Sequence, residues 1–237
     1  MNKQIESYFT KENIKISKVQ LKLLSRYKEL LLDWNNKINL TAIVEEKEFY
    51  YKHFIDSLLL LKIKELELSG KSIIDVGTGA GFPGLPLAIM QEGLFVTLSD
   101  SLNKRIEFLK EATKELELPN IYLLEGRAED LGKNELYREN FDYSVARAVS
   151  KMSVLLEYTL PLVKVDGYFI AYKGPEYEEE LKESKKALEI LGGEIEKVYN
   201  FKIDEFEMER NIIFIKKTKS TPEKYPRRAG VPAKKPL

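Results

Sequence analysis

The chain of 237 residues carries no net charge, because 38 Lys and Arg balance 38 Asp and Glu, and 43% of its residues are apolar. These values are typical of a soluble globular protein with one large core. With no Cys and a single His, disulfides, thiolate metal sites and cysteine nucleophiles are excluded, and we expect no metal.

No segment approaches the roughly 18 apolar residues that a membrane span requires. The first residues show no signal-peptide pattern. We therefore expect a cytoplasmic protein that makes no membrane contact, and we expect it to be a monomer.

Two helices are predicted before the first strand, and we assign residues 1–68 to a helical extension packed on the core. Ser17 should cap the first helix, whose apolar residues recur at spacings of three and four: Val19, Leu23, Leu24, Tyr27, Leu30, Leu31 and Trp34. The second is predicted from Glu45 to about Ile63. It carries His53, for which a structural role is favoured and a catalytic role stays open.

Strands and helices alternate along residues 69–217. Strands are predicted from Ser72 and at 94–100, 120–124, 141–146 and 167–172, with helices at 103–116, 152–163 and 176–191. This alternation predicts an α/β fold in which helices cover both faces of a parallel sheet. Strands at 194–201 and 210–216 are joined by a link too short for a parallel crossover, so this last pair should be antiparallel.

The stretch from Ser72 to Gly84 combines an apolar strand, a carboxylate and a glycine-rich turn that leads into a helix. Glycines such as Gly77 and Gly79 permit positive φ and let a ligand lie against the backbone, and Pro83 suits the first turn of the helix. Free N–H groups in the loop and the positive end of the helix should attract an anion.

Polar residues follow the other strands. Asp100, Glu129, Arg147 and Lys173 all lie at or shortly after predicted strand ends. Because ligands of doubly wound sheets bind beyond the carboxyl ends of the strands, we expect these residues around one crevice.

Two cofactors compete for this crevice. Residues 79–84 match the dinucleotide pattern G-x-G-x-x-G, and Asp100 lies where a ribose-binding carboxylate would. S-adenosylmethionine presents the same ribose but carries an ammonium group instead of a pyrophosphate, and the charge of Asp75 would favour the ammonium. We therefore favour S-adenosylmethionine, with a buried, turn-capping Asp75 and an NAD(P)-dependent oxidoreductase as alternatives.

Residues 218–237 are predicted to form a basic, proline-rich tail. From Lys216 onward, eight basic residues stand against one acidic residue, Glu223. The prolines disfavour a regular helix or a central strand, so we expect the tail to lie extended over the surface. Contact with nucleic-acid phosphates is favoured over a merely solubilising role.

Several motifs resemble the bacterial ribosomal RNA small-subunit methyltransferase G family, also called glucose-inhibited division protein B. They are residues 75–84 (DVGTGAGFPG), 98–105 (LSDSLNKR), 125–130 (EGRAED), 145–148 (VARA) and 225–230 (YPRRAG), and the resemblance extends from about residue 39 to the C-terminus. It implies a class I, Rossmann-like S-adenosylmethionine-dependent methyltransferase that methylates nitrogen 7 of a guanine in 16S ribosomal RNA, with the RNA or the small ribosomal subunit as partner. A cofactor-binding protein that binds RNA without catalysis stays open as a further alternative.

By resemblance, Gly77 and Phe82 contact the cofactor, Ala128 and Glu129 frame its adenine, and Arg147 lies between cofactor and substrate. Ring nitrogen 7 already presents a lone pair, so the chemistry needs alignment and no general base. The candidate cofactor-binding residues are Asp75, Gly77, Gly79, Phe82, Asp100, Ala128, Glu129 and Arg147; the candidate catalytic residues are Arg147 and Lys173; and the candidate RNA-binding residues are Lys173, Arg227 and Arg228.

Overall fold

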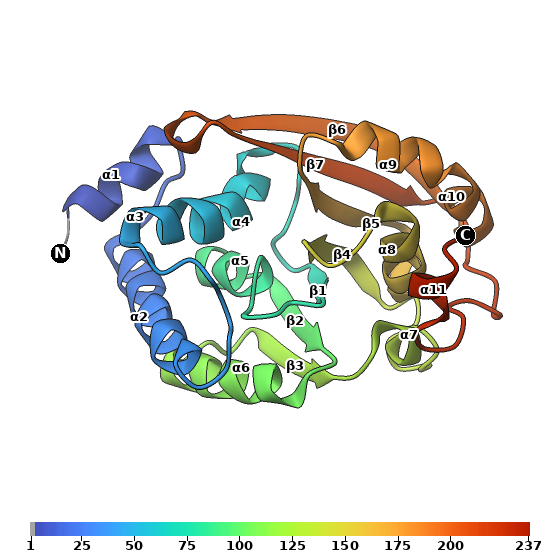
Figure 1. Ribbon diagram of the computed structural model, residues 1–237, viewed down its shortest axis with the longest axis horizontal. Helices are drawn as coiled ribbons and strands as arrows, with labels where there is room; N and C mark the ends of the chain where they lie inside the picture. The colour runs from blue at the N-terminus through green and yellow to red at the C-terminus, as the bar shows by residue number, and fades with distance from the viewer. Residues whose placement is uncertain (1–2) are drawn as a thin grey trace.

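The computed structural model describes residues 3–237 and shows one sheet with helices on both faces (Figure 1). The strand order is β3-β2-β1-β4-β5-β7-β6. The strands are β1 (Ser72–Val76), β2 (Phe95–Asp100), β3 (Ile121–Glu125), β4 (Phe141–Arg147), β5 (Val163–Lys173), β6 (Gly193–Ile203) and β7 (Met208–Lys217). The predicted α/β fold is confirmed.

Strands β1 to β5 are parallel, and β7 is antiparallel to both β5 and β6, as the sequence predicts. Strand β1 pairs with β2 on one side and with β4 on the other. The order of the strands along the chain therefore reverses between β1 and β4. Ligand sites of such sheets lie at this switch point, beyond the carboxyl ends of the strands.

The longer helices alternate with the strands and cover both faces of the sheet. Figure 1 shows α2, α5 and α6 on one side and α8 and α10 on the other. The helices are α1 (Lys3–Lys11), α2 (Lys18–Asn35), α3 (Glu46–Phe49), α4 (Asp56–Leu58), α5 (Gly84–Met90), α6 (Asn103–Glu115), α7 (Ala128–Leu131), α8 (Met152–Thr159), α9 (Tyr177–Glu183), α10 (Lys185–Leu191) and α11 (Val231–Lys234). None of the helices in residues 3–237 is both long and apolar enough to span a bilayer.

The N-terminal helices share an apolar core with one face of the sheet. Ser17 caps α2 in a reciprocal capping box with Gln20, as expected. Tyr27 is fully buried among the rings of Phe54, Phe82 and Phe108. The buried face of α2 is narrower than predicted, because Val19 is 68% exposed.

The predicted helix at 45–63 is helical throughout residues 46–62, but it is not one α-helix. A π-helical segment, Tyr50–Ile55, separates α3 from α4, and a 3-10 segment, Leu59–Lys62, follows. The short helices α1, α7 and α11 were not predicted. The tail is less extended than expected, because α11 forms within it and it packs against α8.

Candidate functional site

Two cavities lie side by side beyond the carboxyl ends of the strands. The first, of about 360 Å³, lies at the ends of β1, β2 and β3, and the second, of about 660 Å³, lies at the ends of β4 and β5. Both are lined by Ala148 and Val149, which follow β4. A ligand in one cavity therefore lies next to a ligand in the other.

Gly77 lines the first cavity with its backbone in the left-handed region, at φ +71°. A Cβ atom built there would lie 3.0 Å from Cγ2 of Val149. Any side chain at this position would therefore fill the space between the loop and the residues after β4. A glycine leaves this space open, so a ligand can approach the backbone here as predicted.

Asp75 does not stand at the mouth of this cavity. Its side chain is fully buried, and its Oδ2 atom accepts hydrogen bonds from the Thr78 hydroxyl at 2.7 Å and from the Gly84 N–H at 2.8 Å. Burial raises the pKa of its carboxyl to about 6, although these two hydrogen bonds act to lower the pKa. The expected direct contact with an ammonium is thus corrected to a loop-capping role, although Oδ1 is buried without a hydrogen-bond partner.

The loop amides are also less available to an anion than expected. The N–H groups of Gly77 and Thr78 donate to the Ser99 carbonyl, and that of Gly79 donates to the Asp100 carboxylate. Pro83 precedes α5 as its N-cap and is not in its first turn. The arrangement therefore offers no set of free donors for a pyrophosphate, which corrects the expectation of an anion site.

Asp100 lines the first cavity, as predicted, with a side chain 3% exposed. Its Oδ2 atom accepts from Gly79 N–H at 3.0 Å and from Arg105 Nη1 at 3.1 Å, while Oδ1 accepts only from Leu102 N–H at 2.9 Å. Because a carboxylate oxygen accepts two hydrogen bonds, Oδ1 has room for one hydroxyl donor such as a ribose would bring.

The opposite wall of the first cavity comes from α7 and α8. Ala128, Glu129 and Tyr158 line it. The Glu129 carboxylate is almost fully buried, and its Oε1 atom accepts a hydrogen bond from Gly230 N–H in the tail at 2.7 Å. Ala128 and Glu129 therefore line the same cavity as Asp100.

Phe82 is buried beside His53 and Arg147. Its ring stacks on the His53 imidazole, with centroids 4.5 Å apart, and the Arg147 guanidinium lies 5.1 Å from its centre. Burial and the charge of Arg147 lower the pKa of His53 to about 3, and its Nε2 atom is 2.8 Å from the Thr41 hydroxyl. Phe82 and Gly79 do not line either cavity, so the structure offers no direct cofactor contact for them.

Arg147 lines the second cavity and is held by an ion pair that the sequence did not predict. Its Nη1 atom donates to Asp56 Oδ2 at 2.6 Å, and Arg210 Nε donates to Asp56 Oδ1 at the same distance. Nη1 also donates to the carbonyls of Lys52 and His53 in the π-helical segment. The Nε and Nη2 groups make no hydrogen bond within residues 3–237 and remain available to a ligand.

Lys173 also lines the second cavity, but its ammonium is already occupied. Nζ donates to the Ser150 carbonyl at 2.8 Å and to Glu180 Oε2 at 2.6 Å, and the side chain is 10% exposed. This corrects the expectation of a direct phosphate contact, because the charge is neutralised by Glu180. The observed geometry gives Lys173 the task of holding the loop that separates the two cavities.

The two tail arginines differ. Arg227 donates from Nη2 to Oε2 and from Nε to Oε1 of Glu157, a fully buried carboxylate of α8. Arg228 is exposed, and its guanidinium makes no hydrogen bond or ion pair within the described residues. Arg227 is therefore a structural anchor, against expectation, and Arg228 alone of the pair is free to bind a phosphate.

Sequence reasoning missed Asp56, Arg210 and Val149. Asp56 lies outside the motifs that carry the family resemblance, and Arg210 lies in a predicted strand without any motif. The signal that could have found Asp56 is a carboxylate on an otherwise apolar helical stretch, since such an acid is usually paired when buried.

The sequence of this chain is similar to those of known proteins. A family model described as rRNA small subunit methyltransferase G matches residues 20–213. A curated relative from Alkaliphilus oremlandii, named Ribosomal RNA small subunit methyltransferase G, is 51% identical over 95% of this chain and 94% of its own. A relative of the same name from Lactobacillus acidophilus is 49% identical over 96% of this chain and 95% of its own.

Solved structures support the fold. M. jannaschii TYW2 in complex with AdoMet is 15% identical, with a TM-score of 0.56 over 74% of this chain and 79% of that one. A SAM dependent methyltransferase from Aquifex aeolicus is 22% identical, with a TM-score of 0.53 over 72% of this chain and 93% of that one.

Proposed function

The chain belongs to the rRNA small subunit methyltransferase G family, and from this premise we propose that it transfers a methyl group to nitrogen 7 of a guanine in 16S ribosomal RNA. It is an S-adenosylmethionine-dependent methyltransferase. The observation that carries the proposal is the pair of adjoining cavities, one suited to the donor and one lined by a guanidinium with free N–H groups.

The first cavity fits S-adenosylmethionine. We assign one ribose hydroxyl to Asp100 Oδ1 and the adenine to Ala128 and Glu129. The methionine end is assigned to the backbone of Gly77, where a Cβ atom would meet Val149. When bound, the cofactor supplies an electrophilic methyl carbon on a sulfonium. We call this the donor cavity and its neighbour the substrate cavity.

The substrate cavity would receive the guanine. Five basic residues line it, against Asp56 and Glu180: Lys52, Arg147, Lys151, Lys173 and Arg210. Arg147 can donate through Nε and Nη2 to the guanine O6 atom or to a flanking phosphate, which leaves the lone pair of nitrogen 7 free to attack. That nitrogen carries no proton, so no side chain has to act as a base, and the buried neutral His53 is not needed as one.

The partner follows from this substrate. We propose that 16S ribosomal RNA, alone or within the small ribosomal subunit, docks over the substrate cavity, that the exposed Arg228 contacts its backbone, and that the reaction takes place in the cytoplasm. A monomer suffices for both cavities, since all the lining residues come from one chain.

The test is to incubate the protein and methyl-labelled S-adenosylmethionine with small subunits that lack the modification, and then to map the labelled base. Label on nitrogen 7 of one guanine is the expected result. Label on an exocyclic amine or on a pyrimidine would refute the assigned chemistry. Saturable donor binding and RNA binding without any transfer would instead identify a non-catalytic RNA-binding protein.

A further inference from the structure

We propose that the C-terminal segment 225–234 supports a wall of the donor cavity from outside, and that Arg227 is a positioning residue for donor binding. This inference rests on the assignment of the first cavity to the donor. In Figure 1 the segment, drawn in red, lies beside α7 and α8, the two helices that supply Ala128, Glu129 and Tyr158 to the donor cavity. It goes beyond the expected role of the tail, which was to contact RNA.

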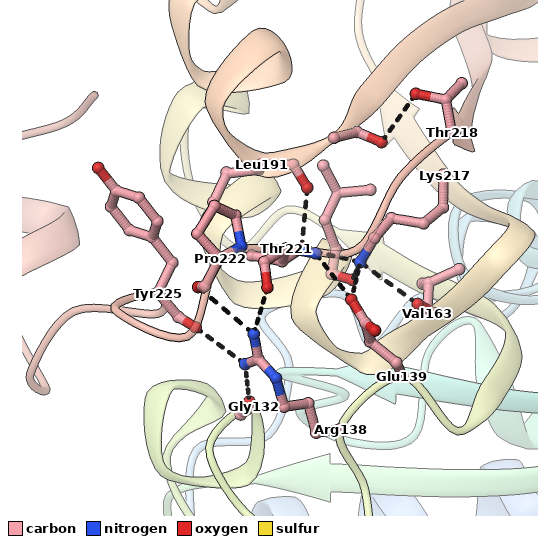
Figure 2. Close-up of polar contacts among 12 residues, drawn as sticks. Gly132, Arg138, Glu139, Val163, Leu191, Lys217, Thr218, Thr221, Pro222 and Tyr225 are labelled. Carbon is pink, nitrogen blue, oxygen red and sulfur yellow. Dashed lines mark hydrogen bonds and ion pairs between the residues drawn. The ribbon is translucent and has the colours of Figure 1, made fainter.

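The segment starts from a rigid base, shown in Figure 2. The Arg138 guanidinium donates to four carbonyls on two sides: Gly132, Thr221, Pro222 and Tyr225. The fully buried Lys217 ammonium donates to Thr221 Oγ1 at 2.8 Å and pairs with Glu139 at 3.0 Å. The chain therefore enters the segment at a fixed position, because each polar group at the base has a partner.

Arg227 then fixes the segment on α8. Its guanidinium donates from Nη2 to Glu157 Oε2 at 2.6 Å and from Nε to Oε1 at 2.9 Å, and its backbone N–H donates to Oε1 at 2.7 Å. A two-pronged pair of this kind sets orientation as well as position. The next residue of α8 is Tyr158, whose side chain lines the donor cavity.

Three residues further on, the segment contacts Glu129, a residue that lines the donor cavity. Gly230 lies in the left-handed region at φ +80°, and its N–H donates to Glu129 Oε1 at 2.7 Å. Glu129 lines the cavity and is 4% exposed, so this backbone donor fixes the side chain of a wall residue. Binding groups need such a supporting contact to hold their geometry.

Arg227 and Arg228 are adjacent but differ in their contacts. Arg227 points to the buried Glu157, whereas Arg228 is exposed and has no side-chain partner within residues 3–237. Truncating Arg227 should release the segment from α8 and loosen the hold of Gly230 on Glu129. Truncating Arg228 should leave both contacts in place, which makes it a matched control.

The experiment measures S-adenosylmethionine affinity by calorimetry, without RNA, for the full-length wild type, Arg227→Ala, Arg227→Lys and Arg228→Ala. We expect Kd to rise about 5- to 10-fold for Arg227→Ala, the loss that one or two weakened hydrogen bonds produce. Arg227→Lys should recover part of this loss, and Arg228→Ala should stay within about twofold. In steady-state assays Arg227→Ala should raise the donor KM, with kcat at saturating donor and the RNA KM nearly unchanged.

A folded Arg227→Ala protein with wild-type donor affinity would overturn the inference, and so would a raised RNA KM with an unchanged donor KM. Thermal unfolding checks that each variant is folded at the assay temperature. If Arg227→Ala does not fold, Glu157→Gln replaces it, because the amide keeps the volume and weakens the pair, and its donor Kd should rise in the same direction. Failure of the wild type to bind the donor would instead refute the proposed function.

Discussion

The Asp56 carboxylate accepts a hydrogen bond from Arg147 Nη1 at 2.6 Å, and the Asp56 side chain is 1% exposed. The second oxygen of the same carboxylate receives Arg210 Nε, so one buried acid is shared by two arginines and leaves a net positive charge at the substrate cavity. Pairing through one nitrogen keeps the rest of the Arg147 guanidinium free. The geometry thus positions Arg147 without using up its ability to bind a ligand.

Arg147→Ala should abolish methyl transfer while donor affinity stays within a few-fold of wild type. Asp56 keeps Arg210 as its partner in this variant, so the protein should remain folded. We expect the single-turnover rate at saturating donor to fall by roughly 100-fold or more, as when a donor to a developing charge is removed. A variant that loses donor binding instead would assign Arg147 to the cofactor. Arg147→Lys should not restore the rate, because an ammonium cannot pair with Asp56 and also present a planar fork.

Lys173→Met should slow methyl transfer without changing how RNA binding depends on salt. The side chain keeps its apolar length but no longer holds the Ser150 carbonyl, so the loop between the cavities loses a fixed point. We expect a lower kcat and a loss of about 1–2 kcal/mol in unfolding free energy. If Lys173 instead neutralised a phosphate, the slope of log K against log salt would become shallower by about 1.

Asp75→Asn should stabilise the protein progressively as the pH rises from 4 to 7. The folded-state pKa of about 6 lies above the usual 3.8 because the carboxyl is buried. The folded protein therefore binds this proton more tightly than the unfolded chain, and the associated stability is present below pH 3.8 and lost as the pH rises through 6. Asn has no charge to bury, so its advantage should grow by about 3 kcal/mol over this range. Urea unfolding at pH 4 and pH 7.5 measures the difference, and an equal difference at both pH values would contradict it.

The same variant tests the expected contact between Asp75 and the ammonium of the donor. An Asn oxygen can still accept from Thr78 and Gly84, so the loop should keep its conformation. We expect S-adenosylmethionine affinity at pH 7.5 to stay within a few-fold of wild type. A loss of more than tenfold would show that the buried charge acts on the ammonium after all.

His53 should be neutral at every pH at which the protein is folded and active. Because its folded-state pKa of about 3 lies below the usual 6.5, the unfolded chain binds the proton more readily, and stability should be lost as the pH falls from 6.5 towards 3. The loss should be roughly 1.4 kcal/mol per pH unit. His53→Phe, compared with wild type by urea unfolding, should remove this part of the pH dependence. A step in the methylation rate near pH 6.5 that disappears in His53→Phe would contradict the assignment.

Much of the fold and part of the site follow from sequence pattern. Alternating strands and helices predict a parallel sheet, and the carboxyl ends of its strands bring Asp100, Glu129, Arg147 and Lys173 to the two cavities. The sequence pattern does not predict which side chains pair with one another. Asp56 and Arg147 are 91 residues apart, and no local periodicity relates them. Whether a charge faces a ligand or a buried partner depends on tertiary packing, which explains the corrected roles of Lys173 and Arg227.

The sequence pattern also did not predict the local backbone conformation. The π-helical segment Tyr50–Ile55 lies within a stretch whose apolar pattern fits an ordinary α-helix. Its register brings the carbonyls of Lys52 and His53 to Arg147, so the departure from α-helix coincides with a side chain of the site. The same holds for Asp75, because the position of a carboxylate before a glycine loop does not reveal whether it faces the ligand or the loop amides.

Arg228→Ala should weaken RNA binding through charge alone. Its guanidinium is exposed and unpaired in the described part of the chain, so one phosphate contact should be lost and the slope of log K against log salt should become shallower by about 1. Arg227→Lys is the control, because it keeps the charge at the neighbouring position and can still pair with Glu157. Filter binding or fluorescence anisotropy with a fragment of small-subunit RNA, between 50 and 200 mM salt, measures both slopes. An equal change in Arg227→Lys, which loses no charge, would mean that the slope reports a displaced tail and not a lost phosphate contact. An unchanged slope for Arg228→Ala would remove Arg228 from the RNA interface.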